Sequence, residues 1–356
     1  MREQFPVLDT CVYLNSNSTG ATPLGVRAVL DRYWATVSEW RDEAWGGWLS
    51  EMDGYVAALA EFIGAPAGTV VIDANLTTLL GRLGTCFDFT GGRDRVVMSD
   101  QEFPTVEFLW RGFTRYGAVP VVADDVVAAI DERTRLVCHT HASYRTGALT
   151  DLARVIDQAH RCGAHVIVDA FQSVGVVPLD VKALGADFVL GGAHKWMCGA
   201  HTAFLYVRED LLPGLRPAAT GWFAGADPLS FGVSEDWAAD ARRMAGGTPI
   251  PLTAMMSRVG LDLLRQVGID AIRAHSLRCT DRILRHADDL GVPVLTPREP
   301  ERRGGVVTLD LPKRVKESLA ARRMIGSWRD GLRIAPHIYN TLDEVDLFMA
   351  ALREVR

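Results

Sequence analysis

A regular alternation of short apolar runs and helical patterns, from about residue 70 to residue 207, is the strongest constraint on the fold of this chain. The runs lie at residues 70–72, 96–98, 119–122, 135–138, 166–168 and 188–190. Such alternation is typical of β-α-β units, in which helices cover a parallel sheet. Pro120 cannot donate a ladder hydrogen bond, so its run fits an edge strand or the start of a strand. The pattern therefore predicts an α/β fold.

After about residue 252 the pattern changes to longer helices. Helices are expected over residues 257–267, 270–290 and 342–355, and strands near 292–295 and 305–311. This mixture predicts a smaller α+β domain. The predicted organisation is an N-terminal segment over residues 1–20, a large domain over 21–252 and a small C-terminal domain over 253–356.

The composition excludes several classes of protein. With 48% hydrophobic and 23% charged residues, the chain has the usage of an ordinary globular protein. Its net charge of -6 offers no field that would attract nucleic acid or a membrane surface. The 6 cysteines form no CxxC pair, and the first residues lack the apolar run of a signal peptide. We therefore expect a cytoplasmic protein with a small-molecule partner.

Lysine is rare in this chain, and one copy stands in a distinctive place. Arginine supplies all but four of the 38 cationic side chains. Unlike arginine, lysine can lose its proton and form a Schiff base. Lys195 lies in a glycine-lined segment just after an expected strand, and Asp169 ends the preceding strand. Because ligands of open parallel sheets bind beyond the carboxyl ends of the strands, both side chains can reach one site.

An amine and a carboxylate at that edge suit pyridoxal 5'-phosphate. Lys195 would hold the cofactor covalently, and Asp169 would pair with its pyridine nitrogen. At 4 Å and an effective dielectric of 20, such a pair is worth about 4 kcal/mol, which keeps the ring protonated as an electron sink. Taken singly, Asp169 is better explained as a turn residue and Lys195 as a surface cation, so the assignment depends on the surrounding motifs.

Three segments around these residues carry a specific motif. Residues 168–175 read VDAFQSVG, residues 184–188 read LGADF and residues 191–196 read GGAHKW. Together they resemble the core of the class V aminotransferase group of pyridoxal-phosphate enzymes, which contains kynureninases and cysteine desulfurases. The resemblance covers nearly the whole chain. It implies fold type I, the aspartate aminotransferase-like fold, with a mainly parallel seven-stranded sheet in the large domain and a homodimer with shared active sites.

The two ends of the chain carry further motifs of this group. Residues 13–20 are similar to the opening of kynureninases, which implies that the N-terminal segment contributes to the active site and that Asn17 binds substrate. Residues 331–341 look like the C-terminal motif, whose arginine, here Arg333, holds the substrate carboxylate. A planar, bidentate guanidinium suits that task, and a surface ion pair is the weaker alternative.

Five residues are expected to bind the cofactor within the same chain, in addition to Asp169 and Lys195. Thr77 and Thr78 open a helix after a strand, where free N–H groups attract a phosphate, although an ordinary helix cap is the alternative. The resemblance implies that Phe103 stacks on the ring, while a core phenylalanine is about as well supported by the residue alone. It also implies that Gln172 donates to the phenolic oxygen and that His194 faces the phosphate.

Two segments resemble parts that serve the neighbouring subunit. The sequence GWF around Trp222 and the sequence GTP around Thr248 are similar to segments that, in this group, reach into the partner's active site. We therefore expect both residues to contact the partner's cofactor. His139 and His141 share one face of a strand, but no third ligand stands out, so no metal is expected. For Trp34, Trp40, Trp45 and Trp48 of the N-terminal helical region, a core or dimer contact is the default and a substrate wall is the alternative.

Several positions depart from the known branches. Kynureninases usually have aspartate, histidine, tyrosine and histidine where this chain has Val106, Gln172, His194 and Gly225. Cysteine desulfurases need a mobile cysteine upstream of the terminal arginine motif, and residues 298–333 contain none. The sequence therefore predicts that the chain is not a cysteine desulfurase.

The expected function is that of an enzyme acting on an amino acid through an external aldimine and removal of the α-proton by Lys195. A kynureninase-like or β-eliminating reaction, with cleavage of a C–C or C–S bond by a lyase or hydrolase, is the first expectation. A class V aminotransferase is the alternative. The alternative from another class is a non-catalytic fold relative that acts as a binding protein, against which the retained Asp169 and Lys195 argue.

Overall fold

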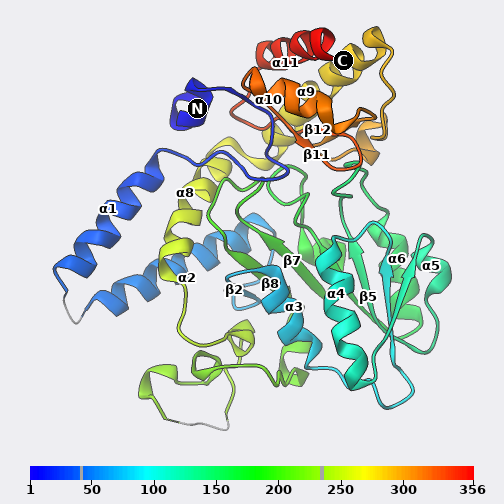
Figure 1. Ribbon diagram of the computed structural model, residues 1–356. Coiled ribbons are helices and arrows are strands. Elements are labelled where there is room, and N and C mark those ends of the chain that lie inside the picture. The colour runs from blue at the N-terminus through cyan, green and yellow to red at the C-terminus, as the bar shows by residue number, and fades with distance from the viewer. Residues whose placement is uncertain (41–42, 233–235) are drawn as a thin grey trace.

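The computed structural model describes residues 1–40, 43–232 and 236–356, and a seven-stranded sheet lies at its centre (Figure 1). The strand order is β2-β8-β7-β6-β5-β3-β4. The strands are β2 (Val70–Asp73), β3 (Arg95–Ser99), β4 (Val119–Ala123), β5 (Thr134–Thr140), β6 (His165–Asp169), β7 (Phe188–Gly192) and β8 (Ala203–Val207). β8 runs opposite to the other six strands of this sheet, so the predicted, mainly parallel seven-stranded sheet is confirmed. β4, which contains Pro120, lies at the edge, as predicted.

Both faces of the sheet are buried under helices, which explains why its strands read as continuous apolar runs. Successive residues of one strand join different core clusters: Val97 faces α2, α6 and α8, whereas Val96 and Met98 face α3 and α4. The helices of this part are α1 (Gly25–Ser38), α2 (Ala44–Phe62), α3 (Leu76–Gly84), α4 (Pro104–Gly112), α5 (Val126–Ala129), α6 (Leu152–Arg161), α7 (Val181–Leu184) and α8 (Pro251–Val267).

The C-terminal part packs helices against a three-stranded antiparallel sheet of order β11-β12-β9. Its elements are α9 (Ile269–Leu290), β9 (Val307–Leu309), α10 (Lys313–Ala321), β11 (Ser327–Trp328), β12 (Leu332–Ile334) and α11 (Leu342–Val355). The strand predicted near residues 292–295 is wrong, because only Val294 forms an isolated bridge there. The helix α10 was not predicted. The domain boundaries at residues 20 and 252 stay predictions.

The N-terminal segment connects the two parts. β1 (Val12–Tyr13) pairs in parallel with β10 (Met324–Ile325), and Asn15 forms a bridge with Ala335. Gly20 then donates its N–H to the carbonyl of His194 over 2.8 Å. A Cβ on Gly20 would lie 2.0 Å from the carbonyl oxygen of Lys195, so only glycine allows this close approach.

Short 3₁₀ helices complete the described structure, at Arg2–Gln4, Pro6–Asp9, Phe113–Tyr116, Glu209–Gly214, Trp222–Ala224, Pro228–Ser230, Ala241–Met244 and Pro300–Arg302. Over the three described ranges, the helices include none with the length and apolar character needed to span a membrane.

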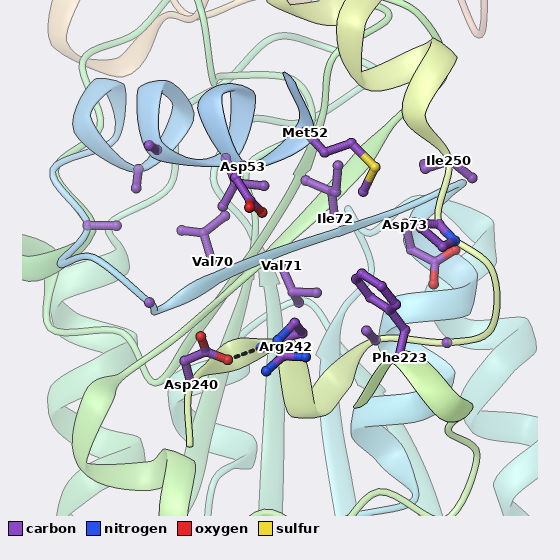
Figure 2. A pocket seen from close by; sticks show the side chains of 18 of the residues that line it. Met52, Asp53, Val70, Val71, Ile72, Asp73, Phe223, Asp240, Arg242 and Ile250 are labelled. Carbon is purple, nitrogen blue, oxygen red and sulfur yellow. Dashed lines mark hydrogen bonds between the residues drawn. The ribbon is translucent and has the colours of Figure 1, made fainter. Parts of the chain in front are cut away.

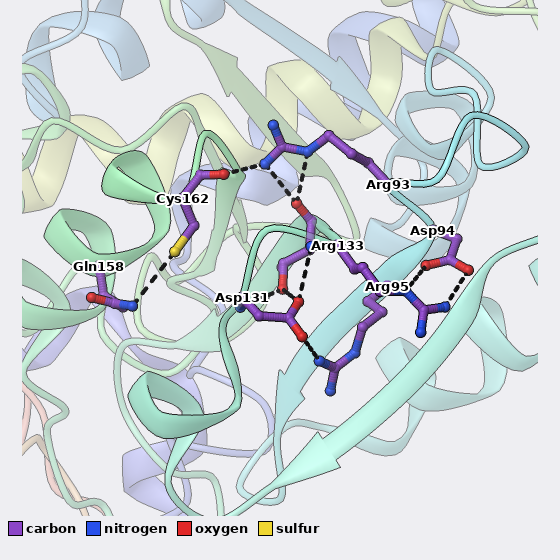
Figure 3. Close-up of polar contacts among 8 residues, drawn as sticks. Arg93, Asp94, Arg95, Asp131, Arg133, Gln158 and Cys162 are labelled. Carbon is purple, nitrogen blue, oxygen red and sulfur yellow. Dashed lines mark hydrogen bonds and ion pairs between the residues drawn. The ribbon is translucent and has the colours of Figure 1, made fainter.

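The strand starts are tied together at the end of the sheet where β3 and β5 begin (Figure 3). Arg95 forms an ion pair with Asp131, and Arg133 pairs with Asp94 over 2.7 Å. Arg93 donates to the backbone carbonyls of Thr134 and Cys162. These contacts involve the amino ends of the strands and leave the carboxyl ends for the candidate site.

Three of the four tryptophans of the N-terminal region lie together, because Trp40 and Trp45 contact the ring of Trp48. Trp48 is buried and stacks on Tyr33, with ring centroids 5.1 Å apart. Trp34, Trp40 and Trp45 are exposed in the single chain.

Candidate active site

Lys195 and Asp169 lie at the carboxyl ends of adjacent parallel strands. Asp169 is the last residue of β6 and pairs with Leu190 of β7, and Lys195 follows the end of β7 by three residues. Both line a cavity of about 360 Å³. The same cavity is lined by the predicted residues Asn17, Thr77, Phe103, Gln172, His194 and Arg333. The chain therefore brings together most of the residues that the sequence singled out.

The amine of Lys195 faces aromatic rings in this cavity. Nζ lies 4.7 Å from the centroid of the Phe171 ring and 5.7 Å from that of Phe103. The pKa of Lys195 is lowered to about 8, chiefly by burial; the charge of Asp169 opposes this effect and that of Arg333 adds to it. A lysine in this environment exists partly as the neutral amine at physiological pH, which is the form that reacts as a nucleophile or base.

Asp169 is held by the backbone beside it. Its Oδ1 accepts a hydrogen bond from the N–H of Phe171 over 2.8 Å. Burial raises the pKa of Asp169, while this hydrogen bond and the charge of Lys195 lower it. A protonated ring nitrogen is a suitable partner for such a carboxylate.

Asn17 links Gln172 and Arg333. Gln172 donates one amide hydrogen to the carbonyl oxygen of Asn17 over 2.9 Å and accepts a hydrogen bond from Trp196, which leaves its second amide hydrogen for a ligand. With its amide oxygen turned toward Arg333, Asn17 accepts from Nη1 and Nε at 3.2 and 3.3 Å. Arg333 also donates to the carbonyl of Tyr144 over 2.7 Å.

Among Asn17, Gln172 and Arg333, only the guanidinium of Arg333 carries a charge. Burial and the neighbouring Arg329 lower its pKa to about 10, so it is still charged at neutral pH. Its guanidinium lines the cavity and can bind a carboxylate.

The two threonines at the start of α3 differ in position. Thr78 donates its N–H and its hydroxyl to Oδ1 of the cap residue Asn75, over 2.9 and 3.1 Å. Thr78 is not among the residues that line the cavity, and its predicted contact with the cofactor stays a prediction. Thr77 lines the cavity at the helix N-terminus, where backbone N–H groups favour an anion.

His194 lies beside Lys195 and is uncharged at neutral pH. Its ring stacks on that of His201, with centroids 4.4 Å apart. Burial lowers the pKa of His194 to about 4, and the charge of Lys195 acts in the same direction. A neutral imidazole can donate one N–H to an anionic ligand without adding charge to the cavity.

Trp222 and Thr248 lie away from this cavity. Trp222 is 40% exposed and stacks on Phe231, with centroids 5.4 Å apart. Thr248 lines a different groove of about 680 Å³, which runs between α2, the edge strand β2 and residues 240–250 (Figure 2). Their predicted contact with a partner's cofactor stays a prediction.

Several residues of the site were not predicted from the sequence. Tyr144, Arg329 and Asn75 line the cavity, and Asn75 also caps the N-terminus of α3. Glu102, directly before Phe103, is buried behind Asp169. Its position next to a predicted stacking residue was the one available signal. His139 and His141 lie outside the cavity lining, and each has a buried Nδ1 without a hydrogen-bond partner in the described part of the chain.

A family model described as "Aminotransferase class-V" matches residues 110–325. The chain belongs to the class V aminotransferase family. Kynureninase from Pseudomonas fluorescens is 30% identical over 359 residues, which cover 93% of this chain and 85% of the relative. An uncharacterized aminotransferase, YcbU from Bacillus subtilis (strain 168), is 29% identical over 357 residues. The match covers 97% of this chain and 94% of the relative.

Solved structures share the fold. The cystine C–S lyase C-DES, in complex with its product cysteine persulfide, matches with a TM-score of 0.89 and 23% identity, over 99% of this class V chain and 100% of its own. A C-DES variant with glycine covalently linked to pyridoxal phosphate reaches a TM-score of 0.92 over 100% of both chains, at 23% identity. The family and these structures confirm the predicted fold type I and pyridoxal 5'-phosphate as the cofactor. The donors of the cavity fit that group, with an amine of lowered pKa, a buried carboxylate and a helix N-terminus.

The prediction that the chain is not a cysteine desulfurase is wrong. The apo cysteine desulfurase from Thermococcus onnurineus NA1 matches with a TM-score of 0.86 and 22% identity, over 99% of this chain and 96% of its own. The prediction rested on one cysteine missing from residues 298–333. A single loop position is too little to exclude a group whose fold extends over nearly the whole chain.

Proposed function

We propose that this class V enzyme removes the α-proton of an amino acid and then cleaves a C–C or C–S bond beyond the α-carbon, in a kynureninase-like or β-eliminating reaction. The observation that carries the proposal is the single cavity in which Lys195, Asp169 and Arg333 meet. The kynureninase relatives and the cystine C–S lyase support cleavage over simple amino transfer. An aminotransferase is the second candidate, because the relative from Bacillus subtilis is named as an uncharacterized aminotransferase.

In the proposed mechanism each side chain has one task. Arg333 binds the α-carboxylate of the substrate and thereby directs the α-carbon toward the amine of Lys195. Lys195, neutral in part at physiological pH, accepts the α-proton on Nζ. Asp169 would hold the pyridine nitrogen of the cofactor, Phe103 would lie against its ring, and Thr77 with the start of α3 would hold its phosphate. Bound pyridoxal phosphate supplies the electron sink that makes the α-proton acidic.

Borohydride reduction of the holoenzyme, followed by digestion, tests the attachment. We expect the reduced cofactor on the peptide that contains Lys195. Product analysis then separates the reactions. Kynurenine would give alanine and an aryl acid, and cystine would give pyruvate, ammonia and cysteine persulfide. Amino transfer would give a keto acid with the aminated cofactor. Absence of any adduct on Lys195 would refute the proposal.

The lowered pKa of Lys195 predicts the pH dependence of cofactor uptake by the apoenzyme. The neutral amine is the reacting form, so the rate should rise with pH and level off above about pH 8. Between pH 7 and pH 9 we expect roughly a tenfold increase, whereas an amine with a pKa near 10.5 would gain about a hundredfold. Stopped-flow absorbance measures the rate, and an α-acetylated lysine amide under the same conditions is the control. A rate that rises in parallel with that control would contradict the lowered pKa.

We also propose that a second copy of the chain completes the site. Trp222 and Thr248 lie outside the cavity of their own chain, and the groove beside Thr248 follows the unpaired edge of β2. Arg82 fixes this region, since it pairs with Asp73 of β2 over 2.9 Å and donates to the carbonyls of Ala219 and Met244.

Subunit mixing tests the shared site. A Lys195→Ala chain lacks the amine, and a Thr248→Val chain is expected to retain the cofactor poorly. When the two variants are co-expressed, the mixed dimer contains one site with both native residues, so activity should return. Each variant expressed alone is the control. Failure of the mixed protein to exceed the controls, despite mixed dimers in native mass spectrometry, would show that Thr248 acts within its own chain.

A further inference from the structure

Glu102 is a buried carboxyl group that the mechanism above does not use. It precedes Phe103 at the start of α4 and is only 7% exposed. Neither of its carboxyl oxygens has a hydrogen-bond partner of ordinary geometry among the described residues. A buried, unpaired carboxylate is costly, so its presence behind the site requires an explanation.

The surroundings of Glu102 favour its neutral form. Glu102 and Asp169 line the same small cavity of about 10 Å³. Its other lining residues are Leu76, Leu80, Val106, Cys138, Ile167 and Leu190. Burial raises the pKa of Glu102 well above its usual range, the charge of Asp169 raises it further, and the backbone N–H groups of Thr140 and Phe103 oppose this only in part.

The titratable and charged groups around Glu102 are few. Asp169 faces it from β6, and Cys138 faces it from β5. Burial keeps the pKa of the Cys138 thiol well above its usual value, so that group is neutral. The residues of α3 and α4 at this cavity are apolar. On the far side of Asp169, the charge of Lys195 lowers the pKa of Asp169.

We propose that Glu102 is a positioning residue that acts through Asp169: as a neutral acid it leaves Asp169 the single negative charge behind the cofactor ring. If Glu102 ionised, a second negative charge would lie behind Asp169 and would strengthen the hold of the ring nitrogen on its proton. The protonation state of Glu102 therefore determines the total negative charge beside the ring nitrogen. It also determines the range of pH over which that charge is constant. The inference rests on the role proposed above for Asp169.

The test compares Glu102→Gln with Glu107→Gln in the holoenzyme. Glu107 lies in the first turn of α4, on its surface, where it accepts a hydrogen bond from Arg111 over 2.8 Å. We expect the infrared spectrum of the wild type at neutral pH to contain the carbonyl stretch of a protonated carboxyl. This band should be lost in Glu102→Gln and retained in Glu107→Gln.

The visible spectrum of the bound cofactor supplies a second measurement. In the wild type and in Glu107→Gln, the absorption band should shift at alkaline pH as Glu102 ionises, and Glu102→Gln should lack this shift. An infrared band that persists in Glu102→Gln, or a shift identical in all three proteins, would overturn the inference. Borohydride labelling of Lys195 distinguishes the two failures, since an unlabelled wild type refutes the proposed function itself, whereas a labelled one confines the failure to Glu102.

Discussion

Replacement of Lys195 by alanine is expected to lower turnover by about 10⁴-fold and to abolish covalent retention of the cofactor. The substitution removes the group that accepts the α-proton, and general base catalysis alone contributes about 10² to 10⁴-fold. Loss of the covalent tether adds to this effect. Initial rates with the substrate that the product analysis identifies, together with the mass of the borohydride-treated protein, measure both consequences.

The matched control for this prediction is Lys195→Arg. Arginine keeps the positive charge and much of the length of lysine, but it stays protonated at any accessible pH. We expect it to be as inactive as Lys195→Ala. If Lys195→Arg retained much of the wild-type rate, the side chain would act as a cation and not as a base or nucleophile.

Replacement of Asp169 by asparagine is the second change with a large expected effect. An ion pair at 4 Å in an effective dielectric of 20 is worth about 4 kcal/mol, and its loss corresponds to roughly a thousandfold decrease in kcat/KM. The asparagine keeps the shape of the side chain but removes the charge that holds the proton on the ring nitrogen. Steady-state kinetics measure the decrease, and the visible spectrum reports the protonation of the bound cofactor.

The conservative variant Asp169→Glu separates charge from packing. It retains the carboxylate, so part of the activity should return relative to Asp169→Asn. Equal kcat/KM values for the wild type and Asp169→Asn would contradict a direct role of this carboxylate in the chemistry.

The sheet could be predicted from the sequence because both of its faces are buried. Each strand then reads as an uninterrupted apolar run, and Pro120 even marked the edge strand. The small domain was predicted less well. Its sheet consists of strands of two or three residues, which are too short to leave a periodic pattern, and the expected strand near residue 294 is a single bridge.

The candidate site was predictable where a motif placed a residue at the end of a strand. Asp169 and Lys195 are of this kind. The choice between Thr77 and Thr78 was not, because it depends on which hydroxyl the cap residue Asn75 engages. Glu102 was missed for a similar reason: a glutamate before a helix usually lies on a surface, and only the packing of α3 and α4 against β5 and β6 buries this one.

The hydrogen bond from Gly20 to the carbonyl of His194 gives the N-terminal segment an amide whose exchange depends on the state of the active site. The segment pairs with β10 and Ala335 at one end. At its other end, Gly20 is hydrogen-bonded to the loop that contains His194 and Lys195. We expect separation of the two parts of the molecule to strain this contact, because the segment is bonded to both parts. The rate at which the Gly20 amide exchanges its hydrogen for deuterium would record how often that opening occurs, without any label placed in the cavity.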